Sequence, residues 1–500
     1  MMGAFVTSRI TGLFRNIVVG YMFGTTPEYA AYLAGMRIPD FLFQVLAGGA
    51  VASAFIPVFT GYIARGQDDE GWRVVSSLFN IALLVLTPIA GLLIIFAPQV
   101  ISVIAPGFDP ELQALAGNLA RIMLASPIFF TLGCFSTSVL NSHRRFFLAA
   151  IAPTVYNLSI IAGALLLGST LGVYGLAIGS ALGAVLFFAV QVPGLRQVRM
   201  VYRPVLDLAH EGVREVGKLM APRAIGLAAT QINFLVALVL ASGMAEKYAA
   251  LDYAWTLTML PLGVFAMAIS TAVFPTLAQQ QALEQMAELK RTLISSLKII
   301  LYLTVPASIG LIVLRYPIIT LIFERGQFTS QSTSATAFAL QFYAAGLVGL
   351  AATEIITRAF YALHDTKTPV LVAIGAMAIN ISLAIPLVRY LEQGGLALAA
   401  TIASTIEAIL LLYLLRRRIG SLEEQRLVSS LAKTTAASVA MGATVYLFAI
   451  HLGSWLAVNT LVNQIVLVGA SVGFGACFYA VLSMVLGCDE ARYIRRLISR

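Results

Sequence analysis

The feature that most constrains this chain is a series of long apolar runs, separated by short connections that hold most of its charged residues. A helix needs about 20 predominantly apolar residues to cross the hydrocarbon core of a bilayer. Only 11% of the residues are charged, whereas a soluble fold carries about 25%, so most of the surface must face lipid. This pattern excludes a soluble enzyme, a nucleic-acid-binding protein and a disordered protein.

The apolar runs predict an all-α polytopic membrane protein with about 14 transmembrane helices. Because Arg9 and Arg15 interrupt the first run, we expect it to remain as a span and not to be cleaved as a signal peptide. The expected spans lie near residues 3–23, 30–62, 76–104, 112–140, 147–168, 171–193, 214–242, 248–278, 291–314, 334–361, 369–388, 395–415, 431–451 and 463–487.

The basic residues between these spans predict the orientation of the chain. The even-numbered connections and the C-terminal tail hold 21 Lys and Arg residues, whereas the odd-numbered connections hold four: Lys247, Arg315, Arg325 and Arg389. Cytoplasmic loops carry the excess of Lys and Arg. We therefore expect a multi-pass membrane protein with both termini in the cytoplasm. The net charge of +9 then serves orientation, and no nucleic-acid partner is expected.

An internal duplication divides the chain. Phe55-Ile56-Pro57 matches Val273-Phe274-Pro275 further on, and the same offset, within a residue, pairs Pro88 with Pro306, Pro98 with Pro317 and Gly107 with Gly326. A further match pairs Asn157-Leu158-Ser159 with Asn380-Ile381-Ser382. Each copy contains six spans, so the copies share one orientation and are related by a pseudo-two-fold axis along the membrane normal. We predict an N-lobe (1–195, helices 1–6), a C-lobe (196–415, helices 7–12) and a C-terminal part (416–500, helices 13–14 and a tail). Two such lobes are typical of alternating-access transporters.

Charged residues inside the spans indicate the substrate. An ionisable side chain at mid-bilayer costs about 2.5–3.5 kcal/mol on insertion scales, so each one implies a partner or a water-filled cavity. Arg9 and Arg15 have no acid in their span, and the guanidinium fork suits phosphate oxygens, so these two indicate an anionic substrate. Pairing with a nearby acid is the structural alternative for Arg37 with Asp40, and for the Glu354–Arg358 pair.

No catalytic or metal site is predicted. Gly212 to Lys218 has phosphate-loop spacing, but Leu219 replaces the Mg²⁺-binding hydroxyl. The four histidines and three cysteines lack the spacing of a zinc or disulfide framework. A membrane-embedded glycosyltransferase or hydrolase would need clustered acids, and the nearest cluster, Asp68-Asp69-Glu70, is expected to be a solvated cytoplasmic loop. We expect a transporter without a cofactor.

Several motifs along the chain carry a family resemblance. They are Thr7 to Arg15, Arg37-Ile38-Pro39, Ala50 to Pro57, Ala105-Pro106-Gly107-Phe108, Leu140-Asn141-Ser142, Ala152-Pro153-Thr154 with Asn157, Gly326-Gln327-Phe328-Thr329 and Asp365-Thr366-Lys367-Thr368-Pro369. With these motifs the chain resembles the MurJ (MviN) lipid II flippases of the multidrug/oligosaccharidyl-lipid/polysaccharide exporter superfamily. The resemblance implies fourteen helices, two six-helix lobes, a lipid-facing groove from helices 13 and 14, and transfer of an undecaprenyl-diphosphate-linked peptidoglycan precursor from the inner to the outer leaflet. It also implies the bacterial inner membrane as the location, and a lipid-linked substrate and membrane lipids as partners; we expect a monomer.

Departures from the family pattern concern the site. The two helix-1 arginines match Arg9 and Arg15, but the family's following acid is Asn16 here. Its helix-2 arginine pair falls at Phe43-Gln44 and its helix-8 arginine at Thr256. Arg37, Arg121 or Arg223 would have to compensate if the substrate is a lipid diphosphate. The predicted substrate-binding residues are Arg9, Arg15, Asn16, Arg37, Gln44 and Arg223.

Other functions stay open at this point. The chain could move another lipid-linked anion, or serve as a scaffold without transport. A drug–cation antiporter of the same superfamily would need a buried acid, whereas the first lobe offers mainly Arg. Some relatives bind Na⁺ between helices 7, 11 and 12. The matching oxygens of Asn233, Asn380 and Thr401 have no carboxylate beside them, so no metal site is predicted there.

Overall fold

The structure is a computed structural model that describes residues 2–46, 50–421, 424–456 and 460–491, and within these ranges every regular element is helical. The side chains of residues 2–6, 46, 50, 52–53, 222–223, 225–226, 229–230 and 424 lie outside the description. The chain divides into two compact units. Unit 1 comprises Met1–Ala249 with Gly326–Phe328, and unit 2 comprises Ala250–Arg325 with Thr329–Arg500.

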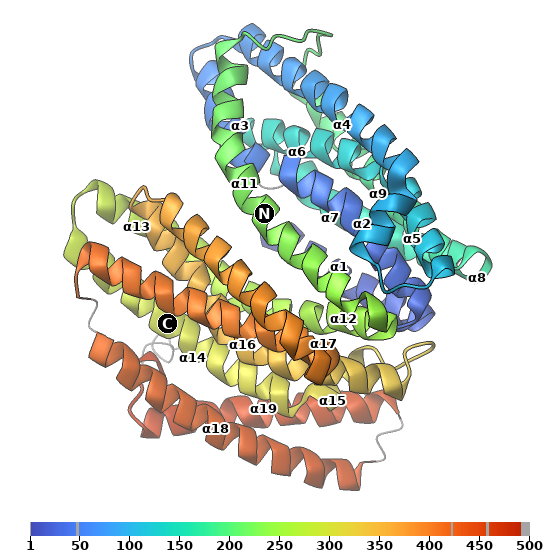
Figure 1. Cartoon of the computed structure of the whole chain (residues 1–500). Helices are drawn as coiled ribbons and strands as arrows, with labels where there is room; N and C mark the ends of the chain where they lie inside the picture. Colours follow the sequence, from blue (N-terminus) through green and yellow to red (C-terminus); the bar gives the residue numbers. More distant parts are fainter. Residues whose placement is uncertain (1, 47–49, 422–423, 457–459, 492–500) are drawn as a thin grey trace. The chain divides into compact units, whose positions relative to one another are not determined.

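Unit 1 is built from eleven α-helices within the described residues (Figure 1). Helix α2 lies against α5, α7 lies between α1 and α9, and α11 packs against α2, α3 and α4. Aromatic side chains fill the core between α3, α4 and α6, with Phe55 and Phe59 fully buried. The helices are α1 (Met2–Phe23), α2 (Pro27–Leu46), α3 (Ala50–Ala64), α4 (Asp68–Ile104), α5 (Pro110–Met123), α6 (Ser126–Ser142), α7 (Phe146–Ala162), α8 (Gly168–Leu171), α9 (Val173–Ala189), α10 (Val192–Gln197) and α11 (Glu211–Ala241), with a π-helical turn at Gly163–Leu167.

The 3₁₀ turn Ser242–Met244 and the first residues of α12 belong to unit 1, and unit 2 begins within α12 at Ala250. Helices α14, α16 and α17 form its centre, and α18 lies against both α14 and α19 (Figure 1). The helices are α12 (Ala245–Pro261), α13 (Ala268–Ala282), α14 (Met286–Val313), α15 (Arg315–Ile322), α16 (Ser330–Ala362), α17 (Lys367–Ile419), α18 (Glu424–Trp455) and α19 (Leu461–Val485), with a π-helical turn at Leu262–Met267.

Ten helical stretches in the described residues are long and apolar enough to cross a bilayer. This confirms an all-helical, multi-pass membrane protein. Two of the ten are much longer than one crossing: residues 231–282 and Lys367–Ile419. The second contains a break at Glu392, whose φ of 49° is not helical. The acidic run Asp68-Asp69-Glu70 is exposed as expected, but it forms the first turn of α4 and not a loop, because acids stabilise a helix N-terminus.

Small residues let α7 and α9 approach closely. A Cβ atom added at Gly175 would lie 2.7 Å from the carbonyl oxygen of Gly163, and one at Gly179 would lie 2.9 Å from the carbonyl oxygen of Ser159. The Ser159 hydroxyl donates to the Gly179 carbonyl at 2.9 Å. Close backbone approach of this kind is the usual role of small residues in membrane helices.

The two glycines that the duplication pairs both lie in tight contacts within unit 1. The amide of Gly107 donates to the Ser242 hydroxyl at 2.9 Å, and an added Cβ at Gly107 would lie 2.7 Å from the Gly243 Cα. Gly326 has a φ of +61°, and its added Cβ would lie 2.8 Å from the Tyr21 ring. Both positions therefore require glycine for close approach.

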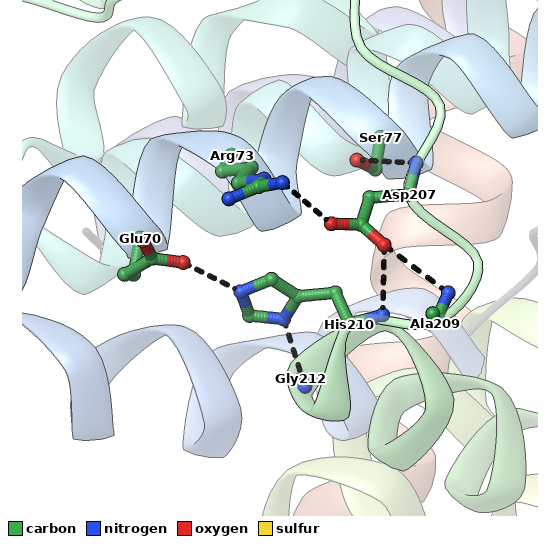
Figure 2. A network of polar contacts seen from close by, with 7 residues as sticks. All are labelled: Glu70, Arg73, Ser77, Asp207, Ala209, His210 and Gly212. Carbon is green, nitrogen blue, oxygen red and sulfur yellow. Dashed lines mark hydrogen bonds and ion pairs between the residues drawn. The ribbon is translucent and has the colours of Figure 1, made fainter.

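The connection between α10 and α11 is held against α4 by side chains (Figure 2). Asp207 forms an ion pair with Arg73 at 2.9 Å, and its amide donates to the Ser77 hydroxyl at 3.3 Å. His210 contacts Glu70 through Nε2 at 2.8 Å, while its Nδ1 accepts from the Gly212 amide at 3.1 Å and so caps α11. Residues 212–218 are helical, so they cannot form a phosphate-binding loop.

Asp365 joins the two ends of α17. Its Oδ1 accepts from the amides of Lys367 and Thr368 at 3.1 and 3.0 Å, its Oδ2 accepts from the Thr368 hydroxyl at 2.7 Å, and Arg418 pairs with the same Oδ2. Burial opposes ionisation of Asp365, but the hydrogen bonds from Thr368 and the Arg418 charge outweigh it, so the pKa of this carboxyl lies below its ordinary value. Asp365 in this motif thus caps the N-terminus of α17, and its ion pair with Arg418 acts as a clamp between the two ends of that helix.

Arg121 compensates for a proline in α4. Pro98 has no amide hydrogen, so it cannot donate to the carbonyl of Ile94 one helical turn earlier. The Nε of Arg121 donates to that carbonyl at 3.0 Å, and its Nη1 donates to the Asn118 side chain at 3.2 Å. These contacts give Arg121 a structural role.

Candidate functional site

The candidate site centres on Arg15, which lies near the middle of α1. Its Nε and Nη2 donate to the side-chain oxygen of Asn16 at 3.1 and 2.9 Å, and its Nη1 donates to that of Asn157, in α7, at 3.1 Å. Both asparagines are buried, at 9% and 7% exposure. The guanidinium is therefore fixed between two helices by two carboxamides.

The nature of these partners decides what Arg15 can do. A carboxamide orients a guanidinium by hydrogen bonding but carries no charge, so these contacts leave the positive charge of Arg15 uncompensated. The side chain is only half-buried, which leaves part of the guanidinium accessible. A charged fork that is held in place is suited to bind phosphate oxygens at two points. Arg9, six residues earlier on α1, is exposed.

Arg37, predicted to bind substrate, contacts aromatic residues of unit 1. Its Nε donates to the Tyr248 hydroxyl at 3.0 Å, and its guanidinium carbon lies 5.1 Å from the centre of the Phe234 ring. A cation over an aromatic face is stabilised electrostatically. These contacts join α2 to α11 and to the start of α12, so at least part of the Arg37 side chain has a structural role.

Phe43, which stands where the family has an arginine, belongs to an aromatic cluster. Its ring lies 5.3 Å from Phe130, which in turn lies 4.9 Å from Tyr156 and 5.4 Å from Phe187. Four rings packed in this way stabilise unit 1 by burial, and Phe130 meets Tyr156 and Phe187 edge to face. An arginine at this position would have to leave the cluster or lose its hydration. Gln44 is half-buried beside it.

The structure describes the contacts of Glu354, Arg358 and Thr401 but not those of Arg223. The side chain of Arg223 lies outside the described residues. Glu354 and Arg358 form an ion pair at 3.5 Å one turn apart in α16, which supports the structural interpretation of that pair. The hydroxyl of Thr401 donates to the Phe342 carbonyl at 2.7 Å. Among the described residues, no group of three or more His, Cys, Asp or Glu side chains could hold a metal ion.

Sequence reasoning did not identify the residues that position the cations. Asn157 lies 142 residues from Arg15, and Tyr248 lies 211 residues from Arg37. A signal for Asn157 was nevertheless present, because the duplication pairs it with Asn380 and the family motif contains it. No comparable pattern marked Phe234.

Comparison with known proteins tests the family resemblance. The family model described as "Lipid II flippase MurJ" matches residues 19–466. The probable lipid II flippase MurJ of Haemophilus influenzae is 30% identical over 505 residues, covering 96% of this chain and 97% of that protein. The probable lipid II flippase MurJ of Rhizobium tropici is 30% identical over 518 residues, covering 100% of this chain and 95% of that protein.

Solved structures agree in fold. A lipid II flippase MurJ in an inward closed conformation aligns with a TM-score of 0.81 at 27% identity, covering 99% of this chain and 98% of that one. An inward-facing multidrug resistance MATE family transporter of the MOP superfamily aligns with a TM-score of 0.72 at 18% identity, covering 83% of this chain and 96% of that one, and supports the fold alone. The family model and the whole-length relatives together show that this chain belongs to the MurJ lipid II flippase family.

Proposed function

We propose that this protein is a flippase that moves lipid II, a polyprenyl-diphosphate-linked peptidoglycan precursor, from the inner to the outer leaflet by alternating access. Full-length similarity to proteins named lipid II flippases supports the substrate. The observation that carries the chemistry is Arg15, whose charge is positioned by Asn16 and Asn157 without being neutralised. In this proposal Arg15 and Arg9 bind the diphosphate while the polyprenyl tail stays in lipid.

Arg15 can be tested by complementation of bacteria depleted of their own lipid II flippase, with membrane expression measured in parallel. Arg15→Ala should abolish growth, because it removes the diphosphate ligand. Arg15→Lys should rescue only partly, because a point charge lacks the fork. Asn157→Ala should reduce transport less than Arg15→Ala, because the charge remains but is no longer positioned.

A matched control is Asn118→Ala, which removes the carboxamide beside Arg121 and should complement normally. Normal growth with Arg15→Ala at normal expression would refute the site. Failure of the wild-type chain to complement, together with no lipid II translocation in liposomes, would instead refute the substrate.

Fourteen spans, with both termini in the cytoplasm, are the topology that we propose for this mechanism. A straight helix of 53 residues would be about 80 Å long, far more than the hydrocarbon core of about 30 Å. This length and the break at Glu392 support two crossings by α17 in the proposed topology. The stretch at residues 231–282 likewise contains parts of two predicted spans, and α1 and α2 complete the number. Lobes at 1–195 and 196–415, with 416–500 as an addition, follow from the duplication.

Single cysteines can test this topology on a background without Cys134, Cys477 and Cys488. Cysteines at positions 198 and 110 should react with a membrane-impermeant reagent from opposite sides. Labelling of both from outside would contradict the fourteen-span proposal. A membrane potential could drive the cycle, since it supplies about 2.3 kcal/mol per charge per 100 mV.

A second candidate function is transport of another lipid-linked anion. The observation that favours it is the position of Phe43, which packs against Phe130 where the family has an arginine. The variant with Phe43→Arg and Thr256→Arg distinguishes the two. If it creates lipid II transport in a protein that has none, the native substrate is another anion. If the wild type already transports lipid II, that alternative is excluded.

A further inference from the structure

A strap of residues 198–210 connects α10 to α11 within unit 1. Its Asp207 pairs with Arg73 of α4 at 2.9 Å, and its last residue, His210, contacts both α4 and α11 (Figure 2). Histidine is the one side chain whose ordinary titration falls between about pH 5 and 8. Among the seven residues that Figure 2 draws, His210 is therefore the one that can change its charge in this range.

Two contacts of the His210 imidazole fix where its hydrogen lies. The Nε2 atom is 2.8 Å from a carboxylate oxygen of Glu70, and an ionised carboxylate can only accept, so Nε2 donates. The Nδ1 atom accepts from the amide of Gly212 at 3.1 Å, so Nδ1 bears no hydrogen. The imidazole in this arrangement is neutral, and in this form it caps the N-terminus of α11.

The Gly212 amide depends on this cap. It lies in the first turn of α11, where amides have no carbonyl of their own helix to donate to. Gly212 is buried, and a Cβ atom added to it would lie 2.9 Å from the ring of Tyr62 in α3 and 2.9 Å from the side chain of Val74 in α4. If His210 stops accepting, this buried amide loses its partner unless the first turn of α11 opens to water.

Protonation of His210 has opposite effects on its two contacts. An imidazolium donates from both nitrogens, so a hydrogen on Nδ1 would face the hydrogen of the Gly212 amide and the cap would be lost. The contact of Nε2 with Glu70 would become an ion pair. Because the Glu70 side chain is 48% exposed, solvent screens this gain, and the positive end of the α11 dipole opposes a cation at the same place.

Other charged and titratable groups surround His210, and those of the strap, α3 and α4 have contacts of their own. The Tyr62 ring lies 5.9 Å from the imidazole, and Arg65 lies over the other ring contact of this group, with its guanidinium carbon 5.1 Å from the centre of the Tyr62 ring. Arg214 of α11 donates to the Leu208 carbonyl at 3.2 Å. The remaining groups are Asp207 of the strap, paired with Arg73 of α4; Asp69 of α4, paired with Arg203 of the strap; and the exposed Glu211 of α11.

We propose that His210 is a pH-responsive latch between the strap and α11. The neutral imidazole caps α11 and holds its first turn against α3 and α4. The protonated imidazole releases this turn but keeps the strap attached to α4 through Glu70, while the Asp207–Arg73 pair is unchanged. The latch lies outside the candidate substrate site and goes beyond the proposed function, since its opening can be measured without any substrate.

The test follows hydrogen exchange of the Gly212 amide in the purified full-length protein between about pH 5 and 8. Each rate is divided by the rate of an unstructured peptide at the same pH, which removes the intrinsic effect of pH on exchange. We expect the protection of this amide to fall about fivefold at the acid end, because one helix cap is lost. His210→Ala should show the low protection at every pH.

Two variants assign the effect to this imidazole. His210→Asn supplies a cap that does not titrate, so its protection should stay high and independent of pH. Glu70→Gln keeps an acceptor for Nε2 but removes the charge that favours the imidazolium, so the loss of protection should move to lower pH. The same pH effect in His210→Asn as in the wild type, or an unchanged midpoint in Glu70→Gln, would overturn the latch.

His143→Asn is the matched control. The His143 imidazole also packs on α3 and α4, with its ring centre 5.7 Å from those of Phe59 and Trp72, and its Nδ1 contacts the Val139 carbonyl of α6. This variant should keep the pH effect of the wild type at Gly212. Loss of the effect in His143→Asn, or protection of the wild-type amide that does not change with pH, would refute the proposal.

Discussion

Replacement of Asp365 offers a quantitative test of how α17 is held together. The Asp365 carboxylate is 9% exposed and accepts from two backbone amides, one hydroxyl and the Arg418 guanidinium. Asp365→Asn keeps a side-chain oxygen for the amides but loses the charge that pairs with Arg418. Asp365→Ala removes all of these contacts. The two variants therefore separate the cap from the ion pair.

The expected magnitudes follow from the exposure of each partner. Arg418 is 46% exposed, so solvent screens the pair and its loss should cost about 1 kcal/mol. Loss of a helix cap costs about 0.5–2 kcal/mol in addition. We expect Asp365→Asn to destabilise unit 2 by about 1 kcal/mol and Asp365→Ala by about 2–3 kcal/mol.

Reversible unfolding in mixed micelles, titrated with dodecyl sulfate, provides the assay. A double-mutant cycle with Arg418→Gln isolates the pair, and its coupling energy should be about 1 kcal/mol. Thr405→Ala serves as a control, because the Thr405 hydroxyl contacts only its own helix through the Thr401 carbonyl. Equal destabilisation by Asp365→Asn and Asp365→Ala would refute the separate cap, and a coupling energy of zero would refute the clamp.

Three further predictions concern other contacts. The pKa of Asp365 is lowered in the folded protein, so its charge contributes fully to the free energy of unfolding above its unfolded pKa of about 3.9. This contribution should be lost as pH falls through the folded pKa, so the free energies of unfolding of the wild type and Asp365→Asn, measured against pH, should converge at acid pH. Arg121→Leu should cost about 1 kcal/mol by leaving the Ile94 carbonyl without a donor, and it should cost less in a Pro98→Ala background, where the helix supplies the amide; equal costs would contradict this role. Phe43→Arg should lower the unfolding temperature by placing a charge among aromatic rings, at a cost of about 2.5–3.5 kcal/mol, whereas Phe43→Leu should lower it less.

The sequence determined the helical class and most helix positions because apolar length and charge are local properties. It separated residues 369–388 from 395–415, and the structure has a non-helical Glu392 between them in an otherwise continuous α17. What it could not determine was membership of the compact units. Helix α11 packs against α2, α3 and α4 and belongs to unit 1; the lobe boundaries at 195 and 415 stay predictions. Such packing depends on side-chain contacts between distant segments.

The candidate site shows the same limit. The pattern of Arg9 and Arg15 on an acid-free span was visible in the sequence, but the orientation of Arg15 depends on Asn157 from another helix. The structural role of Arg121 follows from Pro98, 23 residues earlier, and could not be inferred without knowing that the two helices adjoin. Contacts between helices that are distant in the sequence decide which arginines have a structural role and which can bind a substrate.

Unit 1 is built from two segments that are far apart in the sequence, and this affects how it assembles during synthesis. Its contacts include α11 and residues up to Ala249, and then the turn Gly326–Phe328, whose Gln327 amide donates to the Tyr21 carbonyl at 2.9 Å. The ribosome therefore delivers the last piece of this unit 77 residues after Ala249, about 4–15 s later at 5–20 residues per second. During that interval the Tyr21 carbonyl, near the C-terminal end of α1, lacks the Gln327 amide as its hydrogen-bond donor. A chain stalled or truncated before residue 326 would thus present an unfinished first unit to the quality-control proteases of the membrane.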